Sequence, residues 1–163
     1  MNAKDLKLRL DNKDDNICAN SDIGYVSLPL YVLSQKLLNQ IGTFLDKKYT
    51  LSNSEVDVMA SLYSAQETDN TLTPTKLYER LFFSSGGMTK VLKKLEQKGL
   101  IKRIDNKDDK RSKLVQLTQS GKEILKTSLA DVIELEESIF SNLNEAEKQL
   151  LSDLLFKSLD GVD

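Results

Sequence analysis

The chain has 163 residues, 39% of them hydrophobic and 29% charged, with one cysteine, no histidine and a formal net charge of −2. This composition is typical of a globular domain with a buried core, and it leaves almost no residues for histidine-based catalysis or a soft-metal site. We therefore expect a protein that is not an enzyme and that binds no cofactor and no metal ion.

The charge is distributed unevenly along the chain. Residues 76–113 contain twelve Lys and Arg against five Asp and Glu, so this segment is basic and the remainder is acidic. A basic segment in an acidic body is typical of a domain that meets phosphates on one face, although a solvated lysine-rich surface would give the same count. No apolar stretch approaches the roughly 20 residues of a membrane span, and residues 1–20 lack the apolar block of a signal peptide. We expect a cytoplasmic protein.

The first part of the chain predicts an arm and two helices. Residues 1–20 are polar and lack a clear period, which fits a polar N-terminal arm or a short helix. Apolar residues then recur at helical spacing, so we expect one long helix within residues 21–48, with Ser27 as its cap. Ser52 and Glu55 have the spacing of a capping box, which would start the next helix.

The middle of the chain predicts two short helices followed by a hairpin. Thr73-Pro74 suits the cap and the first position of a helix. Small residues at 84–87 indicate a turn into a further helix, which Gly99 would end. Residues 100–104 and 113–117 resemble strands separated by a polar turn, which predicts a β-hairpin.

Two more helices complete the expected fold. Thr118 can cap the first of them and Asn144 the second. The predicted order is ααααββαα, which describes a mostly α-helical fold with a small β-hairpin.

Two helices joined by a tight turn and followed by a basic hairpin indicate a winged helix-turn-helix. The second helix of such a motif enters the major groove of DNA, where base edges can be read. Small turn residues allow the start of that helix to approach a phosphate. A glycine-containing loop with an exposed lysine face would leave a similar pattern. The DNA-binding residues expected from this segment are Ser84, Ser85, Gly86, Thr89, Lys90 and Lys93.

The motifs within residues 51–125, taken in order, resemble the multiple antibiotic resistance regulator (MarR) family of bacterial transcription factors. The flanking helices are similar to that family in pattern only. The matching motifs are Leu72-Thr73-Pro74, Ser84-Ser85-Gly86-Gly87-Met88-Thr89-Lys90-Val91-Leu92-Lys93-Lys94-Leu95-Glu96, Gly99-Leu100-Ile101-Lys102-Arg103, Asp108-Asp109-Lys110-Arg111-Ser112 and Val115-Gln116-Leu117-Thr118-Gln119-Ser120-Gly121.

The resemblance implies roles for four residues of the wing. It implies that Arg111 reaches the minor groove, where the negative potential is enhanced, and that Asp109 orients it. Lys110 lies beside them at the wing tip, and Arg103 would contact a phosphate. An exposed ion pair without any such role would have the same sequence.

The resemblance also implies a homodimer with interlocked N- and C-terminal helices. Two recognition helices then meet half-sites about 34–36 Å apart, although an apolar helix stripe can also be ordinary core. The expected domains are a polar arm (1–20), an N-terminal dimerisation helix (21–48), a winged helix-turn-helix DNA-binding domain (49–120) and C-terminal dimerisation helices (121–163).

Family members often bind a small lipophilic or phenolic ligand between the dimer and DNA-binding regions. Residues of this kind are more often ordinary core than part of a ligand site. Cys18 would carry a redox response instead, but its acidic surroundings raise the pKa of a thiol and weaken it as a sensor. The tentative effector-pocket residues are Tyr25, Tyr31, Leu38, Met59 and Tyr63.

The sequence therefore predicts a sequence-specific DNA-binding transcriptional regulator. We expect a homodimeric repressor that a small-molecule effector releases from a palindromic operator in double-stranded DNA, and that is nucleoid-associated when bound. The alternatives are a redox-responsive regulator acting through Cys18 and a winged-helix module for protein–protein contact. A small hydrolase or transferase is disfavoured because histidine and catalytic spacing are absent from the sequence.

Overall fold

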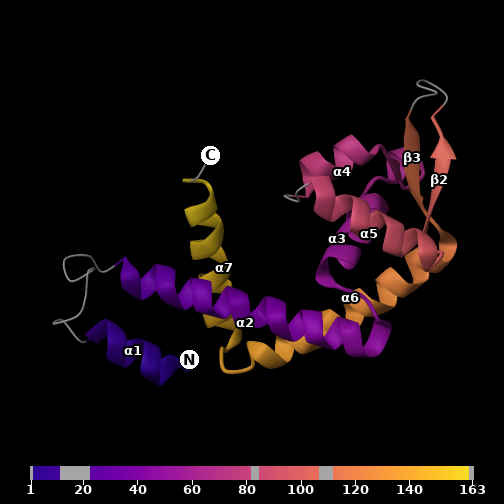
Figure 1. Cartoon of the computed structure of the whole chain (residues 1–163). Helices are drawn as coiled ribbons and strands as arrows, with labels where there is room; N and C mark the ends of the chain where they lie inside the picture. Colours follow the sequence, from indigo (N-terminus) through magenta and orange to yellow (C-terminus); the bar gives the residue numbers. More distant parts are fainter. Residues whose placement is uncertain (1, 12–22, 82–84, 107–111, 162–163) are drawn as a thin grey trace.

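The computed structural model describes residues 2–11, 23–81, 85–106 and 112–161. It contains the predicted series of helices and strands, with a short helix added before them and a two-residue strand added within them (Figure 1). The elements are α1 (Ala3–Asp11), α2 (Gly24–Tyr49), α3 (Asn53–Ser64), the 3-10 turn η2 (Gln66–Thr68), β1 (Thr71–Leu72), α4 (Pro74–Arg80), α5 (Ser85–Gln97), β2 (Ile101–Asp105), β3 (Lys113–Leu117), α6 (Gln119–Ile139) and α7 (Glu145–Leu159).

The hydrophobic core lies where α3, α4, α5 and part of α6 meet the sheet. The sheet is antiparallel with the order β1-β3-β2, so β3 is its central strand. Thr71 of β1 pairs with Gln116; a strand of two residues is too short to show a period in the sequence. Fully buried core side chains come from seven elements and include Leu45, Met59, Leu62, Leu77, Met88, Leu95, Ile101, Val115 and Leu125.

The predicted helix starts at four positions are confirmed by their cap hydrogen bonds. In each case the cap side chain accepts from the backbone N–H three residues later, which stabilises a helix by about 1 kcal/mol. At two of them a glutamate completes a capping box by accepting from the cap residue's own N–H. The four caps are Ser52, Thr73, Thr118 and Asn144.

The predicted cap at Ser27 is wrong. Helix α2 begins earlier, at Gly24, so Ser27 lies inside it. Tyr25 lies in the part of α2 that precedes the predicted cap, and its hydroxyl donates to the carboxylate of Asp11 at 2.7 Å. Pro29 is consequently at the sixth position of the helix, where its missing N–H removes the hydrogen bond to the carbonyl of Tyr25. A contact with α1 thus accompanies a helix start that the local sequence did not indicate.

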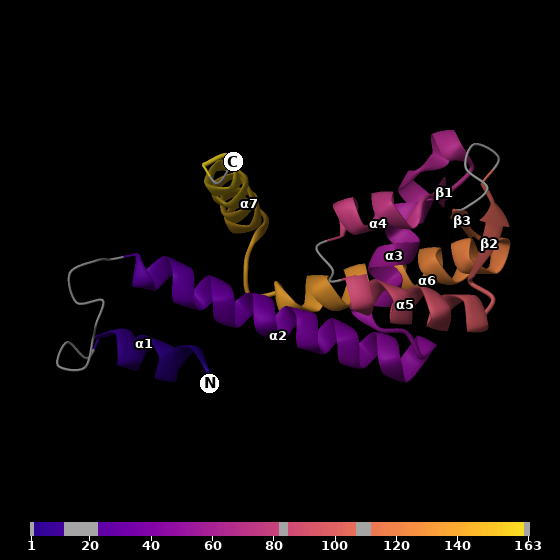
Figure 2. The ribbon, with the colours of Figure 1, turned by 45° about the horizontal axis from the view of Figure 1, so that its top comes forward.

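Part of the polar N-terminal arm is helical, as the short-helix interpretation expected. Helix α1 lies beside the N-terminal half of α2 (Figure 2). Its buried side chains, Leu6 and Leu10, are one helical turn apart and face α2. Two leucines in a short polar segment are too few to predict a helix from the sequence alone.

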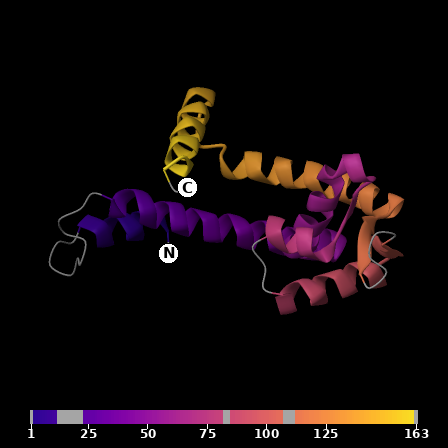
Figure 3. The ribbon, with the colours of Figure 1, turned by 90° about the horizontal axis from the view of Figure 1, so that it is seen from above.

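Helices α2 and α6 form an arm that extends from the winged helix-turn-helix body (Figure 3). They are joined at Asp131 of α6, which accepts a hydrogen bond from the hydroxyl of Tyr49 and lies 2.6 Å from Nζ of Lys48. Helix α7 turns away from the axis of α6 at the far end of this arm. Among the described residues, no helix is both long enough and apolar enough to cross a membrane.

Candidate nucleic-acid interface

Helix α5, the predicted recognition helix, has an apolar inner face and a polar, largely basic outer face. Residues on the inner face, spaced three and four apart, are buried: Met88, Leu92 and Leu95. The residues between them on the outer face are exposed: Thr89, Lys90, Lys93 and Lys94. The core therefore fixes the rotation of α5 so that the predicted major-groove residues face outward. Ser85 and Gly86 are the first two residues of α5, whereas Ser84 lies outside the described residues.

An ion pair between the partly exposed Lys98 and the buried Glu55 anchors the C-terminal end of α5. Nζ of Lys98 donates to Oε1 of Glu55 at 2.5 Å and to the carbonyl of Thr50 at 2.6 Å. Glu55 is only 2% exposed. Burial by itself raises the pKa of its carboxyl, but the hydrogen bonds from Lys98 and Ser52 outweigh burial and lower that pKa below its ordinary value. Glu55 is therefore charged, and it holds Lys98 in place.

A tight turn connects α5 to the wing. Gly99 has a φ of +70°, a conformation that glycine adopts without the cost imposed by a Cβ atom. The N–H groups of Gly99 and Leu100 donate to the carbonyls of Glu96 and Leu95, both at 3.0 Å. These two hydrogen bonds form a Schellman motif, which confirms the predicted helix end. The recognition helix and the wing are thus linked by a short connection of fixed geometry.

Arg103, the predicted phosphate contact, lies on β2 beside α5. Its Nε atom is 3.3 Å from Oε2 of Glu96, and the two side chains are 35% and 43% exposed. Arg103 was predicted from the family resemblance, whereas Glu96 lies in a matching motif but had no predicted role, because a single acid in a basic segment does not show which residue it pairs with. The ion pair joins the recognition helix to the first strand of the wing.

The base of the wing is a regular antiparallel hairpin. Lys113 forms an ion pair with Asp105 across the two strands. Nδ2 of Asn106 donates to Oγ of Ser112 at 2.9 Å, above the last strand pair. The predicted wing-tip residues Asp109, Lys110 and Arg111 lie outside the described residues, and so does Cys18.

The chain does not bring the five predicted effector-pocket residues together. Met59 is fully buried in the core, and Tyr63 is half-buried with Nζ of Lys126 5.7 Å from the centre of its ring. Tyr25, Tyr31 and Leu38 are exposed on α2. At 1.5 Å per residue, the first and last of these three are about 20 Å apart.

Two open grooves flank α2 where it meets the DNA-binding body. One, of about 520 Å³, lies between α2 and the start of α3 and is lined by Leu38, Gly42 and Asn53 among others. The other, of about 790 Å³, lies between α2 and α6 and includes Phe44 and Leu135. In the first groove, Nδ2 of Asn53 donates to the carbonyl of Leu38 at 2.9 Å. Its Oδ1 atom is buried and accepts no hydrogen bond from the described part of the chain.

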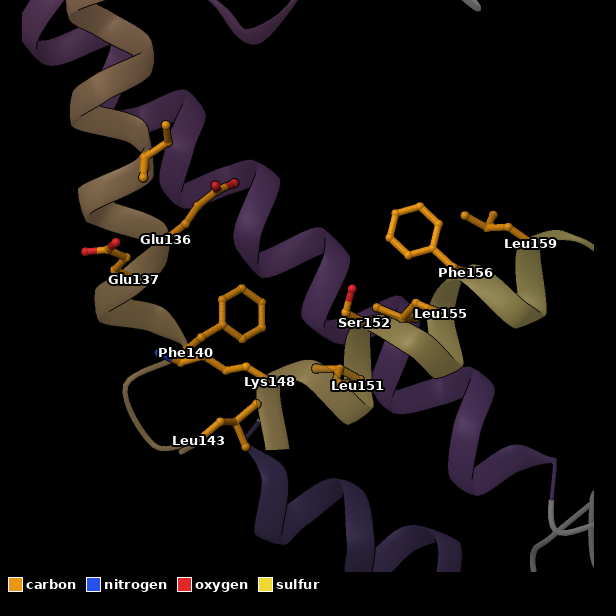
Figure 4. A pocket seen from close by; sticks show the side chains of 11 residues that line it. Glu136, Glu137, Phe140, Leu143, Lys148, Leu151, Ser152, Leu155, Phe156 and Leu159 are labelled. Carbon is orange, nitrogen blue, oxygen red and sulfur yellow. The ribbon is translucent and has the colours of Figure 1, made fainter. Parts of the chain in front are cut away.

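The far end of the arm exposes a large apolar surface. A groove of about 520 Å³ between α6 and α7 is lined by Phe140, Leu151, Leu155, Phe156 and Leu159 among others (Figure 4). The N-terminal half of α2 also exposes large apolar side chains. Large apolar side chains gathered at an exposed groove are typical of interaction sites. The exposed apolar residues of α2 include Val26, Leu30 and Leu33.

The sequence is similar to known transcription regulators. The sequence model of the MarR family matches residues 51–113, from just before α3 to the first residue of β3. The HTH-type transcriptional regulator SarZ of Staphylococcus aureus is 34% identical over 125 residues, which are 77% of this chain and 78% of SarZ. An uncharacterized HTH-type transcriptional regulator of Bacillus cereus is 30% identical over 120 residues, or 73% of this chain and 77% of that protein.

Solved structures share the fold. The reduced form of MarR from E. coli matches with a TM-score of 0.72 and 28% identity, covering 82% of this chain and 95% of that one. A MarR variant from E. coli complexed with operator DNA has a TM-score of 0.69 and 25% identity, covering 86% and 99%. The S. aureus MepR–DNA complex has a TM-score of 0.68 at 23% identity, covering 88% and 100%, which is a likeness of fold alone. The predicted winged helix-turn-helix fold is confirmed.

Proposed function

This chain belongs to the MarR family of HTH-type transcriptional regulators, and we propose that it is a homodimeric repressor that leaves a palindromic operator when a small effector binds. The observation that carries this proposal is the exposed basic face of α5. That face is directed outward by the buried inner face of the same helix and is anchored at its end by Lys98. The operator complex solved for the E. coli MarR variant supports the DNA-binding part of the proposal.

We propose that α5 enters the major groove. Thr89 and Lys90 then reach base edges or phosphates, and Lys93 reaches a phosphate. The small residues at 84–86 allow the N-terminus of α5 to approach the backbone, where its N–H groups and the positive end of the helix dipole attract a phosphate. Arg103 binds a further phosphate beside the wing.

The proposed role of the wing tip rests on the family resemblance. Arg111, oriented by Asp109, would insert into the minor groove, with Lys110 beside the backbone. Arg111→Ala should therefore weaken operator binding at least tenfold without changing the fold. Unchanged binding would remove this role.

The proposed dimer interface is the apolar surface at the far end of the arm. On α2, Ile41 and Phe44 toward the C-terminal end pack against the core, whereas apolar side chains toward the N-terminal end, spaced three and four apart, are exposed: Val26, Leu30 and Leu33. The groove between α6 and α7 lies at that same end (Figure 4). We propose a second copy of this chain as the occupant, because a palindrome requires two recognition helices held one helical turn of DNA apart.

Two measurements test this function. Sedimentation velocity at micromolar concentration should give a dimer, and selection from random double-stranded DNA should enrich a palindrome with half-sites centred about 10 base pairs apart. A monomer would contradict the proposed dimer. If the selection enriches no particular sequence, the proposed sequence-specific DNA binding is contradicted.

We propose the groove between α2 and the start of α3 as the effector site. It joins the arm to the DNA-binding body, and the buried Oδ1 of Asn53 offers an acceptor to a ligand hydroxyl such as that of a phenol. In a fluorescence-anisotropy assay, a panel of small phenols should release wild-type protein from its operator at lower concentration than Asn53→Ala. Equal release of both proteins would place the effector site elsewhere.

A further inference from the structure

We infer that Glu96 is a positioning residue for DNA binding, which holds the guanidinium of Arg103 at the junction between the recognition helix and the wing. Arg103 would there bind a phosphate lying between the major groove and the minor groove. The inference rests on the proposed DNA-binding function and adds a specific role for Glu96, an acid at the end of a matching motif to which the family resemblance assigned no role.

The charge pattern of α5 makes Glu96 conspicuous. It is the only acid between Ser85 and Gln97, and the exposed lysines Lys90, Lys93 and Lys94 lie on the same helix. A carboxylate next to a polyanion repels it, so by charge alone Glu96 should weaken DNA binding. A compensating role is therefore expected of this side chain.

The geometry supplies that role. The backbone of Arg103 is fixed in the sheet, where it pairs with Val115, so only the rotamers of its long side chain need restraint. Oε2 of Glu96 lies 3.3 Å from Nε of Arg103, which is the donor closest to the aliphatic stem. The guanidinium is a planar fork with five N–H donors, so a contact at Nε also orients the terminal nitrogens. Those nitrogens suit bidentate binding of a phosphate.

The end of α5 that carries Glu96 is held in place by contacts on two sides. The Schellman turn at Gly99 fixes the connection between α5 and β2, and Lys98 ties the same end of α5 to Glu55. Glu96 and Arg103 are thus carried by two elements whose relative position is already fixed. The ion pair has little to add to stability, because exposed pairs contribute little, but it can preorganise one DNA contact.

Replacing Glu96 changes DNA affinity in opposite directions through charge and through the position of Arg103, so one variant distinguishes the two effects. In Glu96→Gln, the loss of a negative charge should strengthen DNA binding if only Coulombic forces act. If Glu96 positions Arg103, binding should instead weaken three- to tenfold. The slope of log K against log salt should also become shallower by about two per dimer, because each of the two copies loses a phosphate contact.

Matched variants separate this role from a structural one. Glu79→Gln removes an exposed acid from α4 and should leave binding unchanged or slightly tighter. Arg103→Ala should weaken binding as Glu96→Gln does, and adding Glu96→Gln to Arg103→Ala should cause no further weakening. Glu96→Asp should restore part of the affinity. The thermal unfolding midpoint should be the same for all of these variants.

Two failures can be told apart. If the full-length wild-type protein binds no duplex selectively, the proposed function itself is wrong. If wild type binds its selected palindrome and Glu96→Gln binds equally or more tightly, DNA binding stands and the positioning role is overturned. Additive weakening in the double variant would also overturn it, because Glu96 would then act independently of Arg103.

Discussion

The ammonium group of Lys98 lies 2.5 Å from the carboxylate of Glu55, although the two residues are 43 positions apart in the chain. The same ammonium donates to the carbonyl of Thr50, the residue that caps the C-terminus of α2. One side chain therefore joins the end of α2, the start of α3 and the end of the recognition helix. If α2 moved relative to the DNA-binding body, the contacts of Lys98 would transmit that displacement to the end of α5.

Breaking this junction should destabilise the protein in a pH-dependent manner. Lys98→Met should lower the free energy of unfolding by about 1–3 kcal/mol at neutral pH, because it leaves a buried carboxylate without its main donor. The pKa of Glu55 is lowered by folding, so the stabilisation is complete above about pH 5 and is lost as the pH falls through the folded-state pKa. Urea unfolding at several pH values should show the difference between the two proteins shrinking in acid. A difference that is constant with pH would contradict this assignment.

Gly121 should tolerate no side chain. A Cβ atom there would lie 2.2 Å from the carbonyl oxygen of Leu100 and 2.8 Å from Cδ1 of Leu117. The carbonyl of Leu100 accepts hydrogen bonds from both N and Oγ1 of Thr118, so it cannot retreat without losing them. Gly121→Ala should cost at least about 2 kcal/mol in thermal or chemical unfolding. Gly161→Ala is the control, since its Cβ would meet only Ser158 O at 3.6 Å; equal effects would contradict the predicted clash.

The apolar surface of α7 should control dimerisation. Phe156 is 68% exposed in the single chain, so Phe156→Asp should not disturb the fold of one copy. It should place a charge in the proposed interface, where an unpaired charge is costly. Sedimentation equilibrium is expected to show the dimer dissociating at protein concentrations at least tenfold higher than for wild type. Lys157→Ala, on the same helix, should leave the dimer intact; a fully dimeric Phe156→Asp protein would exclude α7 from the interface.

The outer face of α5 should divide into sequence-reading and phosphate-binding positions. Lys93→Ala should weaken binding to specific and random duplexes by a similar factor and reduce the salt dependence by about one per site, as expected for a phosphate contact. Lys90→Ala should reduce the preference for the selected palindrome more than it reduces binding to random DNA, if Lys90 reaches a base edge. Competition titrations at several salt concentrations measure both quantities. Identical behaviour of the two variants would assign both lysines to phosphates.

Most of the fold could be predicted from the sequence because its signals are local. The capping boxes at Ser52 and Asn144 depend on residues within one helical turn, and they appear in the structure as predicted. The glycine that ends α5 is recognisable for the same reason. The cap assigned to Ser27 was wrong because a contact between Tyr25 and Asp11, made by another helix, accompanies an earlier start of α2.

The exposed basic residues of the candidate interface could also be read from the sequence. The apolar residues of α5 repeat at helical spacing, so the lysines between them must lie on the opposite face. The partners of charged residues could not be read in this way. Neither Lys98 with Glu55 nor Arg103 with Glu96 is marked by a motif, because ion pairing requires only that folding brings opposite charges close together.

Local hydrogen bonding and the helical and strand periods are encoded within a few residues, and they were sufficient to predict the order of the elements and the outward face of the recognition helix. The packing of α1 on α2, the junction at Lys98 and the pair that orients Arg103 depend on contacts between distant segments. Which distant segments come into contact depends on how the whole core packs, because that packing sets the distances between them. No pattern within a few residues specifies those distances.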